Sequence, residues 1–305
     1  MFNSFKSKDY FDFIKIHKIF FTISLVAIFI SFASFFVNKL NFGVDFTGGL
    51  LFDITVKSNE NIAKLRSDFL NSDIKDFNIQ SYGDSGFIIR VSDNQKDKNT
   101  NEVLDTTKST ENIKNIINTS FEESVTYNKV DFVGPQVGKE LIIKGTIALL
   151  LSLIVMLIYI TVRFELDFGL GTVIGLLHDV IIIFGIYSIF KIEFDLTSIA
   201  AILTVVGYSI NDKVVIYDRI REFMVKYKKE NFSTIINTSL TTTLRRTLLT
   251  SSTTLVSLLI LSLIGGESVK DFSLIVFLGI VIGTYSSVFI SAPILLYISK
   301  DKQKQ

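Results

Sequence analysis

Four ionisable residues are notable because they lie within or at the end of long apolar stretches of this 305-residue sequence, where a charge is costly and usually serves a function. They are His178, Asp179, Asp212 and Arg246. A carboxylate beside an arginine stays ionised, whereas a carboxylate that loses its cationic partner in apolar surroundings favours the protonated form. A carboxylate that changes partner between two conformations therefore takes up and releases a proton. These residues indicate proton transfer within a membrane.

Asp212 and Arg246 are expected at similar depth on consecutive spans. Asp212 lies 16 positions after Leu196, and Arg246 lies 19 positions before Gly265. At about 1.5 Å per residue, these separations correspond to about 24 Å and about 28 Å from the same face of the membrane. An Asp212–Arg246 pair is therefore compatible with the geometry. Asp179 is expected about 15 Å into its own span, close to the midplane.

Each of these residues also has a plainer interpretation. Asp212 stands beside the charged run DRIRE and could lie at the membrane interface. His178 and Asp179 could make a static polar contact between helices. Arg246 could anchor its helix on the basic side of the membrane. Spacing alone leaves these alternatives open.

The elements that must position these residues are six predicted membrane helices. Hydrophobic residues make up 48% of the chain, which is typical of a polytopic membrane protein. The first apolar stretch is too long for a signal peptide core and lacks a clear small-x-small cleavage site, so we interpret it as an uncleaved span. The predicted spans, each close to the length that crosses a bilayer, are 19–37, 141–162, 169–190, 196–217, about 247–264 and about 272–298.

Lysines and arginines gather before the first span, between the fourth and fifth, and after the last. By the positive-inside rule, the termini, 1–18 and 299–305, are cytoplasmic, and residues 38–140 lie on the other side. Strand patterns at 50–56, 77–82, 87–92 and 125–133 alternate there with helical patterns at 59–70 and 101–120. The order β-α-β-β-α-β predicts a small α+β domain of ferredoxin-like type. The polar stretch 92–101 is expected to be a mobile loop.

Two glycine-containing motifs flank this domain. GVDFTGGL, Gly43–Leu50, follows the first span, and VGPQVGKEL, Val133–Leu141, precedes the second. Glycine adopts backbone angles that other residues resist, and Asp45 can bond nearby backbone N–H groups. These motifs are either ordinary membrane-exit turns or joints that couple the spans to the domain. The candidate joint residues are Gly43, Asp45, Gly48, Gly49, Gly134 and Pro135.

Composition argues against several other classes of function. The 31 basic and 30 acidic residues nearly cancel, which gives no reason to expect a nucleic-acid partner. Cysteine is absent, and no GxSxG, HExxH or phosphate-loop motif occurs. Two histidines are too few for a histidine metal site. We therefore expect no enzyme activity, no metal and no cofactor, with protons as the coupling ion.

Several long motifs resemble the SecD/SecF family of protein-export membrane subunits, a branch of the resistance-nodulation-division superfamily. The resemblance covers all six spans and both ends of the outer domain, but not residues 57–122. Its motifs are FGVDFTGG, VGPQVGKEL, VRFELDFGLGTVIGLLHDVIII, FDLTSIAAILTVVGYSINDKVVIYDRIRE, LRRTLLTSSTT and IGTYSSVFISAPILLY.

The resemblance implies a multi-pass protein of the bacterial cytoplasmic (inner) membrane. It implies pairing with SecD, association with the SecYEG channel, and use of the proton motive force to complete translocation of preproteins. In the family, the acid of the SIND motif and the arginine of the RT motif are linked to proton conduction. Here they are Asp212 and Arg246, flanked by Asn211 and Thr247. His178 and Asp179 are weaker candidates for the same relay.

Two positions depart from the family pattern. Lys213 stands where a small polar residue is expected, and Arg245 stands where a serine is expected. The second departure leaves open which arginine faces Asp212, although Arg246 directly precedes Thr247 as in the family motif.

Two rival functions remain. One is a half-size, proton-coupled exporter of small molecules or lipids from the same superfamily. The other is a scaffold or sensor that transports nothing, which would leave the charges in the spans unexplained.

Overall fold

A computed structural model describes residues 11–56, 62–72, 74, 77–82, 85–91, 106–121, 125–265 and 267–299. The chain forms two compact units: a membrane unit from residues 1–41 and 146–305, and a sheet unit from residues 42–145. The predicted mobile loop at 92–101 lies outside the described residues.

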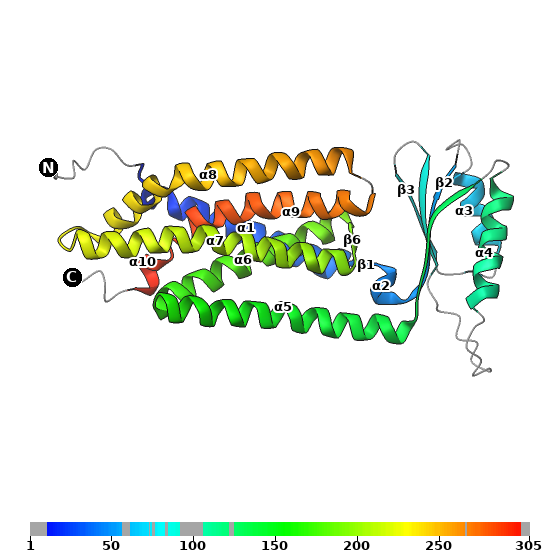
Figure 1. The fold of residues 1–305 in the computed structure, drawn as a ribbon, viewed down its shortest axis with the longest axis horizontal. Helices are drawn as coiled ribbons and strands as arrows, with labels where there is room; N and C mark the ends of the chain where they lie inside the picture. The colour runs from blue at the N-terminus through cyan, green and yellow to red at the C-terminus, as the bar shows by residue number, and fades with distance from the viewer. Residues whose placement is uncertain are drawn as a thin grey trace. The chain divides into compact units, whose positions relative to one another are not determined.

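Six helical segments of the described chain are long and apolar enough to cross a membrane, as the sequence predicts (Figure 1). The sixth segment is α9, a π-helical turn at Ser287–Ser291, and α10. The helices of these segments are α1 (Phe13–Asn38), α5 (Pro135–Arg163), α6 (Leu166–Phe190), α7 (Leu196–Lys226), α8 (Phe232–Ile264), α9 (Glu267–Ser286) and α10 (Leu295–Ile298).

Helix α8 begins at Phe232, well before the stretch that the sequence marks as a span. Residues 233–246 are rich in serine, threonine and asparagine, so they continue the helix without adding to its apolar signal. Asn237 in this extension fixes the start of α1: its Nδ2 donates to Asp12 at 2.8 Å, and its Oδ1 accepts from the Ile14 N–H at 3.0 Å. Such contacts satisfy backbone groups that every helix start leaves open.

Glycines bring the central helices close together. A Cβ atom on Gly279 of α9 would lie 2.2 Å from Val205 Cγ2 on α7, and one on Gly283 would lie 2.9 Å from Ser209 Oγ. On α6, a Cβ atom on Gly175 would lie 2.5 Å from Cε of Lys213. Small residues at helix contacts of this kind are typical of membrane proteins. They bring α6, α7 and α9 near enough for short polar side chains to meet.

The sheet unit has the predicted ferredoxin-like order. Its sheet runs β3-β4-β2-β5, with all neighbouring strands antiparallel. The helices α3 and α4 cover one face of that sheet (Figure 1). The elements are β2 (Gly49–Thr55), α3 (Ile62–Asn71), β3 (Phe77–Tyr82), β4 (Gly86–Val91), α4 (Thr106–Ser120) and β5 (Thr126–Val133).

Alternation along the strands builds the core of the sheet unit. Phe52 and Ile54 on β2 point to the same face as Phe87 and Ile89 on β4, because side chains two positions apart share a face. Leu65 and Phe69 from α3 and Ile113 and Ile117 from α4 complete this core. Three short elements complete the fold: β1 (Asn41–Phe42), α2 (Val44–Thr47) and β6 (Glu193–Phe194).

We predict that Gly279→Ala destabilises the membrane unit, because the added methyl group collides with Val205. Overpacking of this kind costs about 1–3 kcal/mol. Gly207→Ala on α7 is the matched control, since a Cβ atom there meets nothing within 4 Å. The measurement is loss of helical signal during titration with a denaturing detergent. Equal midpoints for the two variants would contradict the close α7–α9 contact.

Candidate functional site: a buried charge network

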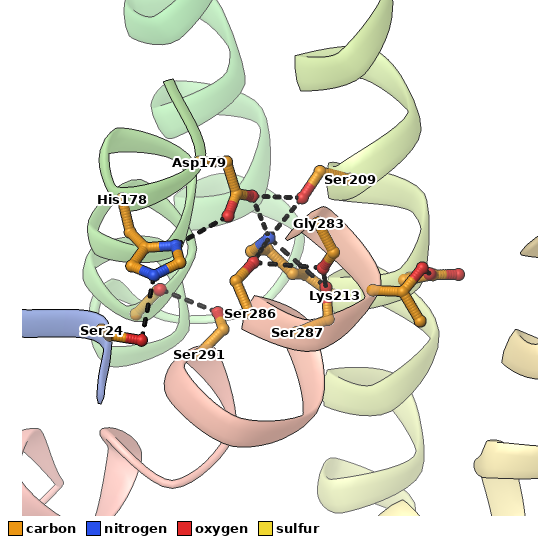
Figure 2. A network of polar contacts seen from close by, with 12 residues as sticks. Ser24, His178, Asp179, Ser209, Lys213, Gly283, Ser286, Ser287 and Ser291 are labelled. Carbon is orange, nitrogen blue, oxygen red and sulfur yellow. Dashed lines mark hydrogen bonds and ion pairs between the residues drawn. The ribbon is translucent and has the colours of Figure 1, made fainter. Parts of the chain in front are cut away.

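Lys213 lies at the centre of a polar network inside the membrane unit (Figure 2). Its side chain is fully buried, and Nζ lies 3.1 Å from Asp179 Oδ2 in an ion pair between α7 and α6. Nζ also lies 2.5 Å from Ser209 Oγ. From the sixth span, Ser286 Oγ and Ser287 Oγ lie 3.1 and 3.3 Å away.

The hydroxyl groups around Lys213 have already donated their hydrogens elsewhere. Ser209 donates to Asp179 Oδ2 at 2.6 Å. Ser286 and Ser287 both donate to the Gly283 carbonyl, at 3.1 and 2.7 Å. All three therefore turn lone pairs toward Nζ, which is the environment of a charged ammonium. Since a buried charge is tolerated only when it is paired and hydrogen-bonded, the network holds Lys213 and Asp179 as an ion pair.

His178 and Asp179, both predicted site residues, are brought together here. His178 Nδ1 lies 2.9 Å from Asp179 Oδ1, and His178 Nε2 lies 3.0 Å from Ser24 Oγ on α1. The exposed fractions of His178 and Asp179 are 4% and 0%, so both contacts are made away from solvent. The network thus joins α1, α6, α7 and α9.

Asp212 is the neighbour of Lys213 in the sequence, but side chains of consecutive residues in a helix leave it in directions about 100° apart. Asp212 is buried, and Thr284 Oγ1 approaches its Oδ2 at 3.5 Å. Thr284 in turn lies 2.9 Å from Ser251 on α8. These hydroxyl groups link α7, α8 and α9.

The predicted Asp212–Arg246 pair is not a direct contact. Within the described chain, no ion pair joins the two residues, and Arg246 is exposed on α8. Its charge acts on Asp212 through space, as does that of Lys213. Asn211 is also exposed, whereas Thr247 is buried. The relay role of these residues stays a prediction.

The sequence singled out Lys213 only as a departure from a family pattern. A helical reading would have placed it in the network, because Ser209 and Lys213 are four positions apart and share one face of α7. The same spacing relates Gly175 to Asp179 on α6, and the missing side chain at Gly175 makes room for the lysine stem. Ser24, Ser286 and Ser287 carried no comparable signal, since serine is common in membrane helices.

The first glycine motif folds as a short helix followed by an unusual turn. Gly43 precedes α2, and Asp45 lies in the first turn of that helix. Gly48 ends it with φ 74° and ψ 159°, and Gly49 has φ 132°. These angles are open almost only to glycine. The motif therefore requires glycine at both positions to turn the chain into β2.

The second motif packs against the first within the sheet unit. A Cβ atom on Gly138, in the first turns of α5, would lie 2.6 Å from the Phe46 carbonyl oxygen in α2. Gly138 was not among the predicted joint residues. Pro135 is the first residue of α5, a position that suits proline, and Gly134 precedes it with open space around its Cα.

We predict that Lys213→Met destabilises the membrane unit by about 3 kcal/mol, the low end of the cost of breaking a buried pair, because His178 still donates to Asp179. Detergent-induced unfolding measures the loss. The double variant Lys213→Met with Asp179→Asn removes both charges and should recover most of it. Equal stability of the single and double variants would show that no charge pair is involved.

Comparison with known proteins agrees with this architecture. Residues 112–301 match the family model described as protein export membrane protein SecD/SecF, C-terminal, and residues 33–60 match the SecD/SecF GG motif. The GG match includes Gly48 and Gly49.

The chain is 45% identical to the protein translocase subunit SecF of Rickettsia bellii, over 96% of this chain and 94% of that protein. Identity to the corresponding Rickettsia rickettsii subunit is 43%, over 97% and 94% of the two chains.

Two solved structures share the fold. The crystal structure of SecDF from Thermus thermophilus, titled a translocon-associated membrane protein, aligns with a TM-score of 0.84 and 29% identity over 98% of this chain. A SecDF structure in a super-membrane-facing form aligns over all of this chain with a TM-score of 0.69. This chain spans 40% of each SecDF chain. These findings confirm the resemblance seen in the sequence: the chain is a multi-pass membrane protein and belongs to the SecD/SecF family of protein export membrane proteins.

Proposed function

We propose that this chain is the SecF-type half of a Sec accessory complex, which uses the proton motive force to complete translocation of preproteins across the cytoplasmic membrane. The similar subunits of Rickettsia are named protein translocase subunits, which supports a role in protein export. In this role the chain is a transport subunit and not an enzyme, and protons are its coupling ion.

A SecD subunit is the proposed partner. The SecDF chain that shares this fold is more than twice as long, and this chain spans 40% of it. A separate SecD chain would supply the remaining part. The description of that SecDF as translocon-associated supports contact with the SecYEG channel, and the preprotein is the proposed cargo. Both termini are placed in the cytoplasm, which follows from the distribution of lysine and arginine.

The observation that carries the proposal is the environment of Asp212. This carboxylate is buried in a membrane helix, and among the described residues its one hydrogen-bond contact is the Thr284 hydroxyl group at 3.5 Å. The nearby buried cation, Lys213, forms its ion pair with Asp179 instead. An ionised carboxylate with so few donors is costly in apolar surroundings, and a bound proton removes that cost. Asp212 is therefore the proposed site of proton uptake, with Arg246 as the exposed cation that acts on it.

The glycine turn at Gly48 and Gly49 is the proposed joint between the spans and the sheet unit. The turn follows α1 and leads directly into β2, the strand that lies between β4 and β5. Glycine at both positions permits these backbone angles, and a turn held in this conformation would transmit movement of α1 to the sheet.

Export of small molecules or lipids is the second candidate function, since the superfamily includes such pumps. The matched family models and the named relatives concern protein export, which favours the first proposal. Co-purification separates the two: recovery of SecD and the channel supports protein export, whereas a homotrimer alone supports the small-molecule pump.

We predict that Asp212→Asn abolishes the part of preprotein export that depends on the proton gradient. Asparagine keeps the size of the side chain but cannot gain or lose a proton near neutral pH. Export into membrane vesicles is measured with and without an uncoupler. The variant should export at the same low level in both conditions, the level that the unaltered protein shows with the uncoupler.

Asp218→Asn is the matched control for that experiment, because Asp218 lies on the same helix with an exposed carboxylate 3.8 Å from Arg163. It should export normally. Full gradient-dependent export by Asp212→Asn would rule out Asp212 as the proton site.

We predict that Gly48→Val and Gly49→Val each impair export while leaving membrane insertion and SecD binding intact. A β-branched side chain cannot adopt the positive φ angles of these residues without strain of about 1–3 kcal/mol. Insertion is measured by protease protection and SecD binding by co-purification. Loss of insertion, SecD binding and export together would instead indicate that the turn is needed only for folding.

A further inference from the structure

A chain of four hydrogen bonds runs from the Asp179 carboxylate to the backbone of α1. Asp179 Oδ1 contacts His178 Nδ1 at 2.9 Å, and His178 Nε2 contacts Ser24 Oγ at 3.0 Å. Ser24 Oγ lies 2.9 Å from the Tyr285 hydroxyl, which donates to the Phe20 carbonyl at 3.0 Å. The side chains of Ser24, His178 and Asp179 are buried. Each of these four bonds joins two protein groups, so the hydrogens are assigned among the residues of the chain.

The direction of each bond follows from the Phe20 end. A carbonyl only accepts, so the single hydroxyl hydrogen of Tyr285 goes to Phe20. Ser24 must then donate its own hydrogen to Tyr285, which leaves a lone pair facing His178. His178 Nε2 therefore carries a hydrogen.

The remaining contact, between His178 Nδ1 and Asp179 Oδ1, then has no hydrogen if the imidazole is neutral. Tyrosine, serine and a neutral imidazole supply three hydrogens for four contacts. One additional proton completes the chain, either on His178 or on Asp179.

The second carboxylate oxygen of Asp179 decides between these positions. Oδ2 accepts hydrogen bonds from Ser209 at 2.6 Å and from the Lys213 ammonium at 3.1 Å. A proton on Asp179 would leave the buried ammonium without its anion, which is strongly unfavourable. A proton on His178 keeps the ion pair and lets both ring nitrogens donate. The additional proton therefore belongs to His178.

The other histidine of the chain provides a contrast. His17 Nδ1 contacts the Ile14 carbonyl and so carries a hydrogen, while Nε2 accepts from the Tyr297 hydroxyl at 2.7 Å. The imidazole supplies the hydrogen for the Ile14 contact and Tyr297 supplies the hydrogen for the other, so a neutral His17 satisfies both contacts. Two buried histidines in one membrane unit thus require different protonation states.

We propose that His178 is a second proton-binding residue of the transport cycle and that it is an imidazolium in the arrangement of Figure 2. The proposal rests on the proposed function for the use made of the proton. His178 is faced by Asp179 on its own helix, Ser24 on α1 and Tyr285 on α9, with Lys213 of α7 behind Asp179. When the proton leaves, one of the four bonds loses its hydrogen. The link between α6 and α1 then weakens, and α1 is the helix that leads to the glycine joint.

The charges of the buried residues agree with this assignment. When Asp212 has released its proton, Asp179 and Asp212 are negative, and Lys213 and an imidazolium at His178 are positive, so the four charges cancel. A proton taken up by Asp212 restores a zero sum only when His178 gives one up to water. The two sites therefore hold a proton in turn, as coupled groups in a medium of low dielectric constant do.

Nitrogen-15 NMR of histidine-labelled protein in lipid vesicles tests the protonation state directly. With two histidines in the chain, His17→Gln leaves the signals of His178 alone, and His178→Gln leaves those of His17. At neutral pH, both ring nitrogens of His178 should be protonated, whereas His17 should show one protonated and one unprotonated nitrogen. An unprotonated nitrogen in His178 at this pH would overturn the proposal.

Adding Asp212→Asn to the His17→Gln protein tests whether the two sites are coupled. Removal of the Asp212 charge should lower the imidazolium share of the His178 signal. An unchanged share would overturn the proposal that Asp212 and His178 hold a proton in turn. In export assays, His178→Gln should lose gradient-dependent export, while His17→Gln keeps it. Full gradient-dependent export by His178→Gln would remove His178 from the cycle. Because NMR needs no export, its result stands apart from the outcome for Asp212→Asn in the export assay.

Discussion

The membrane unit is organised around one buried ion pair, that of Lys213 and Asp179. Two charges in apolar surroundings persist only when nearly every lone pair and hydrogen around them is used. That requirement determines the neighbouring residues. The hydroxyl groups of Ser209, Ser286 and Ser287 turn lone pairs to the ammonium. Ser209 and His178 also make hydrogen bonds with the carboxylate. Three spans, α6, α7 and the sixth segment, contribute to the cage, so the ion pair also fixes which helix faces meet.

Close helix approach is the condition for such a cage. Serine hydroxyls reach only a short distance from their backbone, so α6, α7 and α9 must come within contact of one another. Gly175, Gly279 and Gly283 permit this by leaving no side chain at the crossing points. Each glycine faces a residue of α7 in or beside the network. The polar residues and the glycines are thus one arrangement: the glycines bring the helices together, and the polar contacts hold them there.

Much of this fold could be predicted because the length of apolar stretches and the repeat of apolar residues along the sequence indicate its helices and strands. Apolar length identified six spans, and alternating strands with helical patterns identified the ferredoxin-like unit. The site was harder to predict. Distance along the membrane normal suggested that Asp212 meets Arg246, but depth says nothing about which way a side chain points. In the structure Asp212 is buried, Arg246 is exposed, and the buried ion pair uses Lys213 instead. A sequence gives the position of a residue along a helix more readily than its partner across helices.

The π-helical turn at Ser287–Ser291 places the network on a helix whose two halves need not turn together. Ser287 at its start contacts Lys213. Ser291 at its end donates its hydroxyl hydrogen to the Gly171 carbonyl and turns a lone pair toward the Tyr217 hydroxyl at 2.7 Å. A π turn contains one residue more than an α turn, so moving it by one position along the chain rotates the intervening residue by about 100°. A shift of this turn by one position would therefore change which serine faces the ammonium while the sixth span stays helical.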